Sequence, residues 1–247
     1  MKAVGVIPAR WASTRLPGKV LIDIAGKPLI QHVWERAKKA KKLSDVIIAC
    51  DEQHVVDRAK AFGASAVLTS KDHPSGSDRV AEAAAKTDAE IIVNIQGDEP
   101  LISHKLIDGL VTALEKDADA VVATAVKRIG TTEEFNNPNV VKVVLDKNGH
   151  ALYFSRAAIP FHRDGKPAHL SRYFKHLGIY AYRRKFLFDY CKWPKSFLEE
   201  EEKLEQLRVL EAGSKIKCVE TDTETIGVDT ADDVVKVVDH LKAHSNL

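Results

Sequence analysis

The segment that follows the first apolar run of the chain is rich in cations and hydroxyl groups. Residues 8–19 read Pro-Ala-Arg-Trp-Ala-Ser-Thr-Arg-Leu-Pro-Gly-Lys. A polyphosphate binds well to several cations and backbone N–H groups on a tight loop, and open parallel sheets place such ligands at the carboxyl ends of their strands. The composition therefore predicts a phosphate-binding loop, with a merely basic surface loop as the alternative. Because the segment is neither a Walker A sequence nor a Gly-x-Gly-x-x-Gly fingerprint, kinase-type and dehydrogenase functions are disfavoured.

Two aspartates stand at positions that suit a metal site. Asp98 follows the apolar run 91–95 within Gln-Gly-Asp-Glu-Pro, and we expect its carboxylate at the carboxyl end of a central strand. Asp229, in Gly-Val-Asp-Thr, is a second candidate. Mg²⁺ prefers one or two carboxylates together with phosphate oxygens and water, so both aspartates are candidate ligands. A turn-forming role for Asp98 and a helix lead-in role for Asp229 are the alternatives.

A third polar segment, Ser-Gly-Ser-Asp-Arg at 75–79, precedes a helical pattern. Its helix-start N–H groups and Arg79 could face an anion or a base, although a solvated helix cap explains the segment nearly as well. The ten histidines include no His-Glu-x-x-His pattern, and Cys50, Cys191 and Cys218 have no spacing typical of structural zinc. The sequence therefore points to magnesium rather than zinc chemistry.

These residues need elements to position them, and the first half of the chain alternates between short apolar runs and helical periodicity. This alternation is typical of βαβ units with a parallel sheet, so the predicted fold class is α/β, a mainly parallel sheet flanked by helices. Helices are expected from Pro28, after Ser75 and from about Ser103 to Leu114. The predicted strands are 3–7, 46–49, 66–68, 91–95 and 120–126.

The stretch from about 131 to 215 has β-branched runs at 140–145 and 179–182 and most of the aromatic residues. It predicts a smaller mixed α+β subdomain within one domain that spans residues 1–247. The charge run 199–203 leads into an expected amphipathic helix over 204–210, and its acidic part, 199–202, is expected to be a solvated helix start. A last helix begins after Thr230, where Asp233 completes a pattern that resembles a capping box.

Composition excludes several other classes of protein. The 247 residues are 45% hydrophobic and 29% charged with a net charge of +2, which fits an ordered globular chain without a global attraction to nucleic acid or an anionic membrane. The apolar run near the N-terminus is too short for a signal-peptide core, and no stretch reaches the roughly 20 apolar residues that span a bilayer. Three cysteines without a CxxC pair suit a reducing compartment, so we expect a cytoplasmic protein.

Taken together, eight motifs resemble those of the 3-deoxy-manno-octulosonate (KDO) cytidylyltransferases, also called CMP-KDO synthetases. They are spread from residue 3 to about 240 and stand in the order and spacing of that family. The motifs are IPARWASTRLPGK, KPLI, SGSDR, NIQGDEP, YFSRAAIPF, HLGIYAY, LEQLR and IGVDT. The chain departs from the family pattern at residues 50–52 and 161–163, so the resemblance assigns those residues no role.

The resemblance implies a CTP-binding α/β domain, a subdomain that receives the sugar and forms a homodimer, and Mg²⁺ held by Asp98 and Asp229. It implies that Asp98, Lys19 and Arg10 are the catalytic residues. The implied nucleotide-binding residues are Pro8, Ala9, Arg10, Arg15, Lys19, Ser75, Arg79 and Asp98. The implied sugar-binding residues are Gln96, Arg156, His176, Tyr180, Glu205 and Gln206.

The reaction implied by the resemblance is transfer of CMP from CTP to the anomeric 2-hydroxyl of KDO, with release of pyrophosphate, for lipopolysaccharide biosynthesis. A CMP-sialic acid synthetase is the nearest enzymatic alternative, and a catalytically silent nucleotide-sensing module is an alternative of a different class. The sequence alone does not separate KDO from a close analogue such as its 8-amino form, nor one bound metal ion from two. A role in nucleic-acid binding is disfavoured because the basic residues are scattered and balanced by acids.

Overall fold

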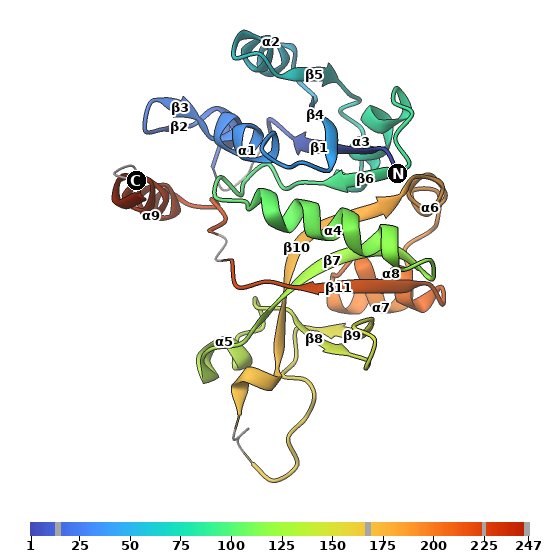
Figure 1. Ribbon diagram of the computed structural model, residues 1–247. Coiled ribbons are helices and arrows are strands. Elements are labelled where there is room, and N and C mark those ends of the chain that lie inside the picture. The colour runs from blue at the N-terminus through green and yellow to red at the C-terminus, as the bar shows by residue number, and fades with distance from the viewer. Residues whose placement is uncertain (13–15, 166–168, 224–225, 245–247) are drawn as a thin grey trace. The chain divides into compact units, whose positions relative to one another are not determined.

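The computed structural model describes residues 1–12, 16–165, 169–223 and 226–244 (Figure 1). The chain forms two compact units, one of Met1–Asp108 with Glu224–Leu247 and the other of Gly109–Thr223. Helix α4 (His104–Lys116) begins in the first unit and continues into the second.

The first unit is built on parallel strands in the order β6, β1, β4 and β5. Strand β1 lies inside this order and, except for its partly exposed Pro8, is buried along its length. Helices α1, α2 and α3 connect the strands and pack beside them (Figure 1). The bounds are β1 (Ala3–Ala9), α1 (Leu29–Ala37), β4 (Leu43–Cys50), α2 (Gln53–Ala61), β5 (Ser65–Leu68), α3 (Gly76–Ala85) and β6 (Ile91–Asn94).

The C-terminal segment packs against the beginning of the chain within this unit. A short helical turn η1 (Lys19–Leu21) leads to the hairpin of β2 (Asp23–Ile24) and β3 (Lys27–Pro28), and the last helix is α9 (Ala231–His244). Apolar side chains from the hairpin, α1 and α9 share one buried cluster that includes Val228. Burial of this cluster removes apolar surface from water and so fixes the residues that directly precede α9.

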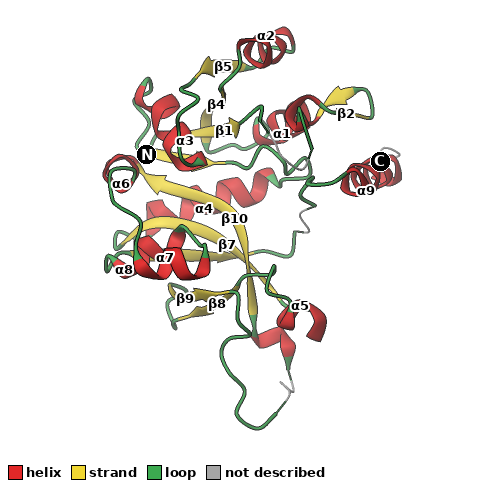
Figure 2. Cartoon of the chain, turned by 180° about the vertical axis from the view of Figure 1, so that it is seen from behind, coloured by secondary structure: helices red, strands yellow, loops and turns green. Residues whose placement is uncertain are grey.

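The second unit contains a mixed sheet. Strand β11 (Lys215–Glu220) pairs in parallel with β7 (Ala120–Arg128), and β7 pairs antiparallel with β10 (Phe174–Arg183). Strand β10 also pairs with β8 (Lys142–Leu145), which pairs with β9 (Ala151–Ser155), both antiparallel. The remaining helical segments are shown in Figure 2. They are α5 (Thr132–Asn136), η2 (Leu170–Arg172), α6 (Arg184–Tyr190), α7 (Phe197–Glu202) and α8 (Gln206–Glu211).

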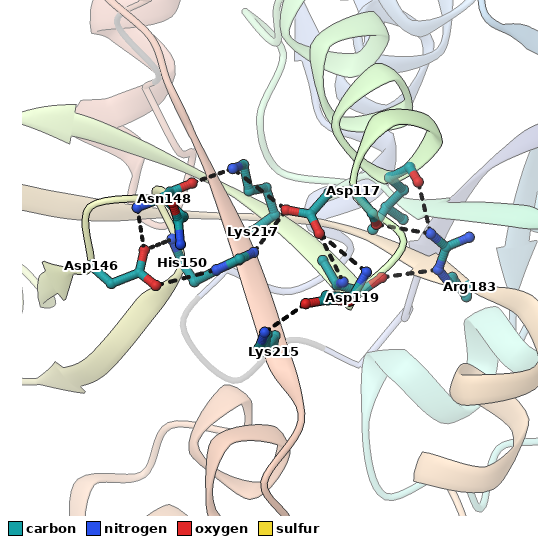
Figure 3. Close-up of polar contacts among 10 residues, drawn as sticks. Asp117, Asp119, Asp146, Asn148, His150, Arg183, Lys215 and Lys217 are labelled. Atoms are coloured by element: carbon teal, nitrogen blue, oxygen red, sulfur yellow. Dashed lines mark hydrogen bonds and ion pairs between the residues drawn. The ribbon is translucent and has the colours of Figure 1, made fainter.

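A polar cluster ties the β8–β9 turn to the rest of the second unit (Figure 3). The Nε2 atom of His150 lies 2.7 Å from Asp117, and its Nδ1 atom lies 3.3 Å from Asp146. Lys217 of β11 lies 3.5 Å from the same Asp117 carboxylate. Arg183 donates to backbone carbonyls at the end of α4 and the start of β7. Burial raises the pKa of Asp117, but the hydrogen bond with His150 and the charge of Lys217 outweigh burial and lower this pKa. Hydrogen bonds from the backbone N–H groups of His150 and Asn148 lower the pKa of Asp146 against a smaller effect of burial.

The predicted fold class is confirmed, and the predicted strands agree with β1, β4, β5, β6 and β7 to within a few residues. The capping pattern at Thr230 is also confirmed, because Asp233 accepts from the Thr230 N–H at 3.0 Å. One expectation was wrong. Glu199 is not solvated but buried, because Arg208 forms an ion pair with it at 2.6 Å and the backbone turns at Lys203 between α7 and α8. The predicted subdomain, 131–215, lies inside the second unit, and its roles in sugar binding and dimerisation stay predictions.

Candidate active site

In the first unit, Lys19 joins the two aspartates that the sequence singles out. Its Nζ atom donates to Asp98 Oδ2 at 2.8 Å and to Asp229 Oδ1 at 3.1 Å. The Lys19 side chain is only 15% exposed. Partial burial opposes its charged form, but hydrogen bonds and charge attraction from both carboxylates outweigh that effect and raise the pKa of Lys19. The lysine is therefore held as a cation at the carboxyl end of the parallel sheet.

Close backbone packing sets the position of Asp98. The residue before it, Gly97, lies so near β1 that a Cβ atom there would be 2.8 Å from the carbonyl oxygen of Pro8. On the other side, the Val228 N–H donates to the Asp98 carbonyl oxygen at 2.9 Å. The chain segment that carries Asp229 is thus hydrogen-bonded directly to the segment that carries Asp98. Only glycine permits the first approach, because any side chain would displace backbone.

The same arrangement suits a magnesium ion. Both carboxylates contact one ammonium group, so a cation between them is already favoured by their charge. Mg²⁺ usually takes one or two protein carboxylates and completes its octahedron with phosphate oxygens and water. Within the described ranges, no group of three or more His, Cys, Asp or Glu side chains could hold a metal by itself. A pair of carboxylates fits a magnesium ion that takes its other ligands from phosphate oxygens and water.

Glu99 is an ionisable neighbour that sequence reasoning did not single out. Burial, with the adjacent charge of Asp98 as a second cause, raises the pKa of Glu99 to about 7. Its position directly after Asp98 in the sequence was visible from the start. Sequence alone does not predict the raised pKa of Glu99, because only the fold shows that its carboxyl group is removed from water.

The loop after β1 carries the other predicted phosphate ligands. Pro8 and Ala9 end the strand, and Arg10 follows them as an exposed side chain. The Trp11 N–H donates to Asp51 Oδ1 at 2.9 Å, and the Trp11 ring meets His54 edge to face with centroids 4.4 Å apart. These contacts anchor the loop beside the end of β4. Arg15 lies outside the described residues.

The predicted nucleotide-binding residues at the start of α3 have structural partners. Ser75 caps α3, since its Oγ atom accepts from the Asp78 N–H at 3.3 Å. Arg79 is buried and forms an ion pair with Asp51 at 3.1 Å, and it also donates to Thr69. The cap was expected, whereas the buried ion pair was not. Direct contact of Ser75 and Arg79 with a nucleotide stays a prediction.

In the second unit, the structure brings together three of the predicted sugar-binding residues. The Tyr180 hydroxyl donates to Gln206 Oε1 at 3.2 Å, and the rings of His176 and Tyr180 have centroids 5.4 Å apart. Gln206 is only 5% exposed, and within the described chain its buried Nε2 atom has no hydrogen-bond partner. Because a buried donor without a partner is costly, this amide is a candidate for contact with a polar ligand.

The other predicted sugar ligands have separate surroundings. Arg156 follows β9, and its Nε and Nη1 atoms donate to the carbonyl oxygens of Glu202 and Pro138 at 2.8 and 3.1 Å. Glu205 is exposed, and its carbonyl oxygen accepts from Tyr190 at 3.1 Å. Gln96 belongs to the first unit, two residues before Asp98. The roles of these residues in sugar binding stay predictions.

Comparison with known proteins defines the class. A family model described as cytidylyltransferase matches residues 4–216 of this chain. Together with the parallel α/β fold, the match makes the chain a nucleotidyltransferase of the cytidylyltransferase type.

Relatives with about half of their residues identical to this chain identify the family within the cytidylyltransferases. The 3-deoxy-manno-octulosonate cytidylyltransferase of Geotalea daltonii is 50% identical, over 98% of this chain and 99% of that protein. The protein of the same name from Solibacter usitatus is 52% identical, over 98% of this chain and 95% of that protein. A solved structure of CMP:2-keto-3-deoxy-manno-octonic acid synthetase complexed with CTP has a TM-score of 0.93 and 44% identity, over 98% and 99% of the two chains. The chain belongs to the 3-deoxy-manno-octulosonate cytidylyltransferase family.

Proposed function

We propose that this chain transfers CMP from CTP to the anomeric 2-hydroxyl of KDO, releasing pyrophosphate, as a step toward lipopolysaccharide. Its membership of the KDO cytidylyltransferase family supports the choice of both substrates. The observation in the chain itself that carries the proposal is the contact of Lys19 with both Asp98 and Asp229, at the end of a parallel sheet. A cation and two carboxylates at such an edge suit a nucleoside triphosphate with its metal ion.

The first unit supplies the nucleotide site in this proposal. Asp98 and Asp229 would hold Mg²⁺, which when bound supplies positive charge next to the phosphate oxygens. Lys19 neutralises charge that develops on the departing pyrophosphate, and Arg10 contributes from the loop after β1. Further contacts to CTP come from Pro8, Ala9, Arg15, Ser75 and Arg79.

The second unit supplies most of the sugar site. Arg156 is the cation suited to the KDO carboxylate, while His176, Tyr180, Glu205 and Gln206 provide groups for its hydroxyls. Gln96 is a further proposed sugar-binding residue. The buried amide of Gln206 supports this assignment, because a sugar hydroxyl would satisfy it.

The chemical step needs no covalent enzyme intermediate. The 2-hydroxyl oxygen attacks the α-phosphorus in line, the bond from that phosphorus to the bridging oxygen breaks, and the hydroxyl proton leaves. Such transfers depend mainly on positioning and on electrostatic stabilisation of the phosphates. Residues that fix the sugar and hold cations against the triphosphate therefore provide the catalysis.

We also propose a cytoplasmic homodimer with no nucleic-acid or membrane partner. In the described part of the chain, no helix has the length and apolarity that crossing a bilayer requires. The cysteine spacing supports the cytoplasmic assignment, since Cys50, Cys191 and Cys218 form no CxxC pair. Sedimentation of the purified chain tests the dimer.

Pyrophosphate release from the purified protein tests the reaction. The assay contains Mg²⁺ and CTP with KDO, 8-amino-KDO or N-acetylneuraminic acid as acceptor, and ATP, GTP and UTP replace CTP in control reactions. We expect turnover with CTP and KDO. Turnover only with another acid sugar would keep the chemistry and change the substrate. No turnover with any pair would leave a nucleotide-binding module without catalysis.

A further inference from the structure

Thr124 is a buried polar residue of β7, and the proposed reaction gives it no role. Its side chain is fully buried. Its Oγ1 atom lies 2.8 Å from His176 Nε2, 2.8 Å from the Ile179 carbonyl oxygen and 3.3 Å from the Leu177 carbonyl oxygen. One hydroxyl therefore faces the imidazole of a predicted sugar ligand and two backbone acceptors at once.

The shape of β10 explains why both carbonyl oxygens reach this hydroxyl. The register of β10 against β7 shifts between Leu177 and Tyr180, and Tyr180 is the residue that pairs with Thr124. Such an irregularity leaves residues out of the regular ladder, and irregularities of this kind often occur beside functional sites. The Thr124 hydroxyl contacts carbonyl oxygens at this irregularity, those of Leu177 and Ile179.

The hydrogen-bonding roles follow from counting protons. A threonine hydroxyl has one proton to donate and lone pairs with which to accept, whereas a carbonyl oxygen only accepts. If the Thr124 proton pointed at His176 Nε2, two carbonyl oxygens would face the hydroxyl oxygen with no proton between them, so the arrangement favours donation to the Ile179 oxygen, the closer of the two. In that arrangement His176 Nε2 donates to Thr124 and carries a hydrogen.

The surroundings of His176 keep this imidazole neutral and fixed in orientation. Burial lowers the pKa of His176 to about 3, so the ring does not take a second proton near neutral pH. The Phe154 ring meets the imidazole edge to face with centroids 5.1 Å apart, and the tilted Tyr180 ring has its centroid 5.4 Å away. With the hydrogen on Nε2, the lone pair is on Nδ1, and a neutral imidazole can accept a hydrogen bond there.

We propose that Thr124 is a positioning residue that holds His176 as the neutral Nε2–H tautomer, so that Nδ1 accepts a hydrogen bond from a hydroxyl of the acid sugar. The sugar half of this inference rests on the proposed function. The tautomer half does not, because it follows from contacts inside the second unit. Thr124 itself touches no substrate in this scheme and acts only through the ring.

The first test is a spectrum of the unaltered protein. With nitrogen-15 histidine, long-range proton–nitrogen correlations distinguish the two neutral tautomers and the charged ring, and the His176→Gln spectrum identifies the His176 signals. We expect the Nε2–H tautomer near neutral pH. An Nδ1–H tautomer or a charged ring would overturn the inference, whether or not the Thr124 variants fold.

The second test compares Thr124→Val with Thr124→Ser. Valine keeps the shape and removes the hydroxyl, whereas serine keeps the hydroxyl and loses a methyl group. We expect the valine variant to lose the single tautomer and to raise KM for KDO roughly tenfold, as loss of about one well-formed hydrogen bond does. KM for CTP should stay within about twofold, and the serine variant should restore both readouts.

Three results would overturn the inference. They are an unchanged tautomer in the valine variant, equal impairment by valine and serine, and a parallel rise of KM for CTP and for KDO. Equal impairment would indicate a packing role for Thr124. If the unaltered chain turns over no KDO, the proposed function fails, while the spectra still decide whether Thr124 sets the tautomer.

Discussion

Replacing Asp98 by asparagine separates the charge of this residue from its shape. The change keeps the side-chain size, and the backbone hydrogen bond from Val228 to the Asp98 carbonyl is independent of the side chain. Lys19 keeps Asp229 as a partner at 3.1 Å. Asp98 is 34% exposed, so after allowance for solvent screening the loss of one ion pair should lower the free energy of unfolding by about 1 kcal/mol or less.

The expected effect on catalysis is much larger than the effect on folding. A group that stabilises charge in a transition state typically contributes about 100- to 1,000-fold in rate, which corresponds to roughly 3–4 kcal/mol. We therefore expect kcat/KM for Asp98→Asn to fall at least about 100-fold. Because Asp98 would hold Mg²⁺, part of the loss should be recovered at higher Mg²⁺ concentration.

The assay is pyrophosphate release with CTP and KDO at several Mg²⁺ concentrations, together with a urea titration of each protein. Asp119→Asn is the matched control, because Asp119 forms an exposed ion pair with Lys215 at 2.7 Å. The control should retain activity within about twofold. If Asp98→Asn kept more than about a third of the original kcat/KM, the assignment of Asp98 to the metal and phosphate site would be wrong.

Three further changes test the surroundings of the site. Gly97→Ala should destabilise the protein by about 1–3 kcal/mol in thermal melts, because the added Cβ would meet the backbone of Pro8. Gly178→Ala is the control, because a Cβ atom there would have open space around it, and equal melting temperatures of the two variants would refute the reasoning. Arg79→Met should lower the free energy of unfolding by roughly 3–5 kcal/mol in urea titrations, because it leaves the buried Asp51 carboxylate without its ion pair. A decrease of less than about 1 kcal/mol would contradict a stabilising role of this ion pair. Glu99 has a raised pKa, so the native state holds its proton to about pH 7 while the unfolded chain releases it near pH 4.5. Stability should therefore fall as pH rises through this window and then level off, and Glu99→Gln should flatten that part of the curve; an identical pH profile for the variant would count against the shift.

Much of the site could be predicted from sequence because its signals are local. Apolar runs of strand length followed by polar residues identified the ends of β1 and β6, and hence Lys19 and Asp98 as residues near one sheet edge. The helix caps at Ser75 and Thr230 were visible for the same reason, since a cap bonds to groups three residues away. The resemblance of eight motifs to those of the KDO cytidylyltransferases then predicted CTP and KDO as substrates.

Other features of the site depend on contacts between distant parts of the chain, and only the tertiary structure shows them. Lys19 meets Asp98 and Asp229 across 79 and 210 positions, and Thr124 meets His176 across 52. No local pattern encodes such pairs, because they form only when strand order and register place the segments together. The burial that raises the pKa of Glu99 and lowers that of His176 has the same origin. The sequence by itself determined which groups are present and which elements carry them, and folding decided which of them are desolvated, which are paired and therefore which charges and protons they hold.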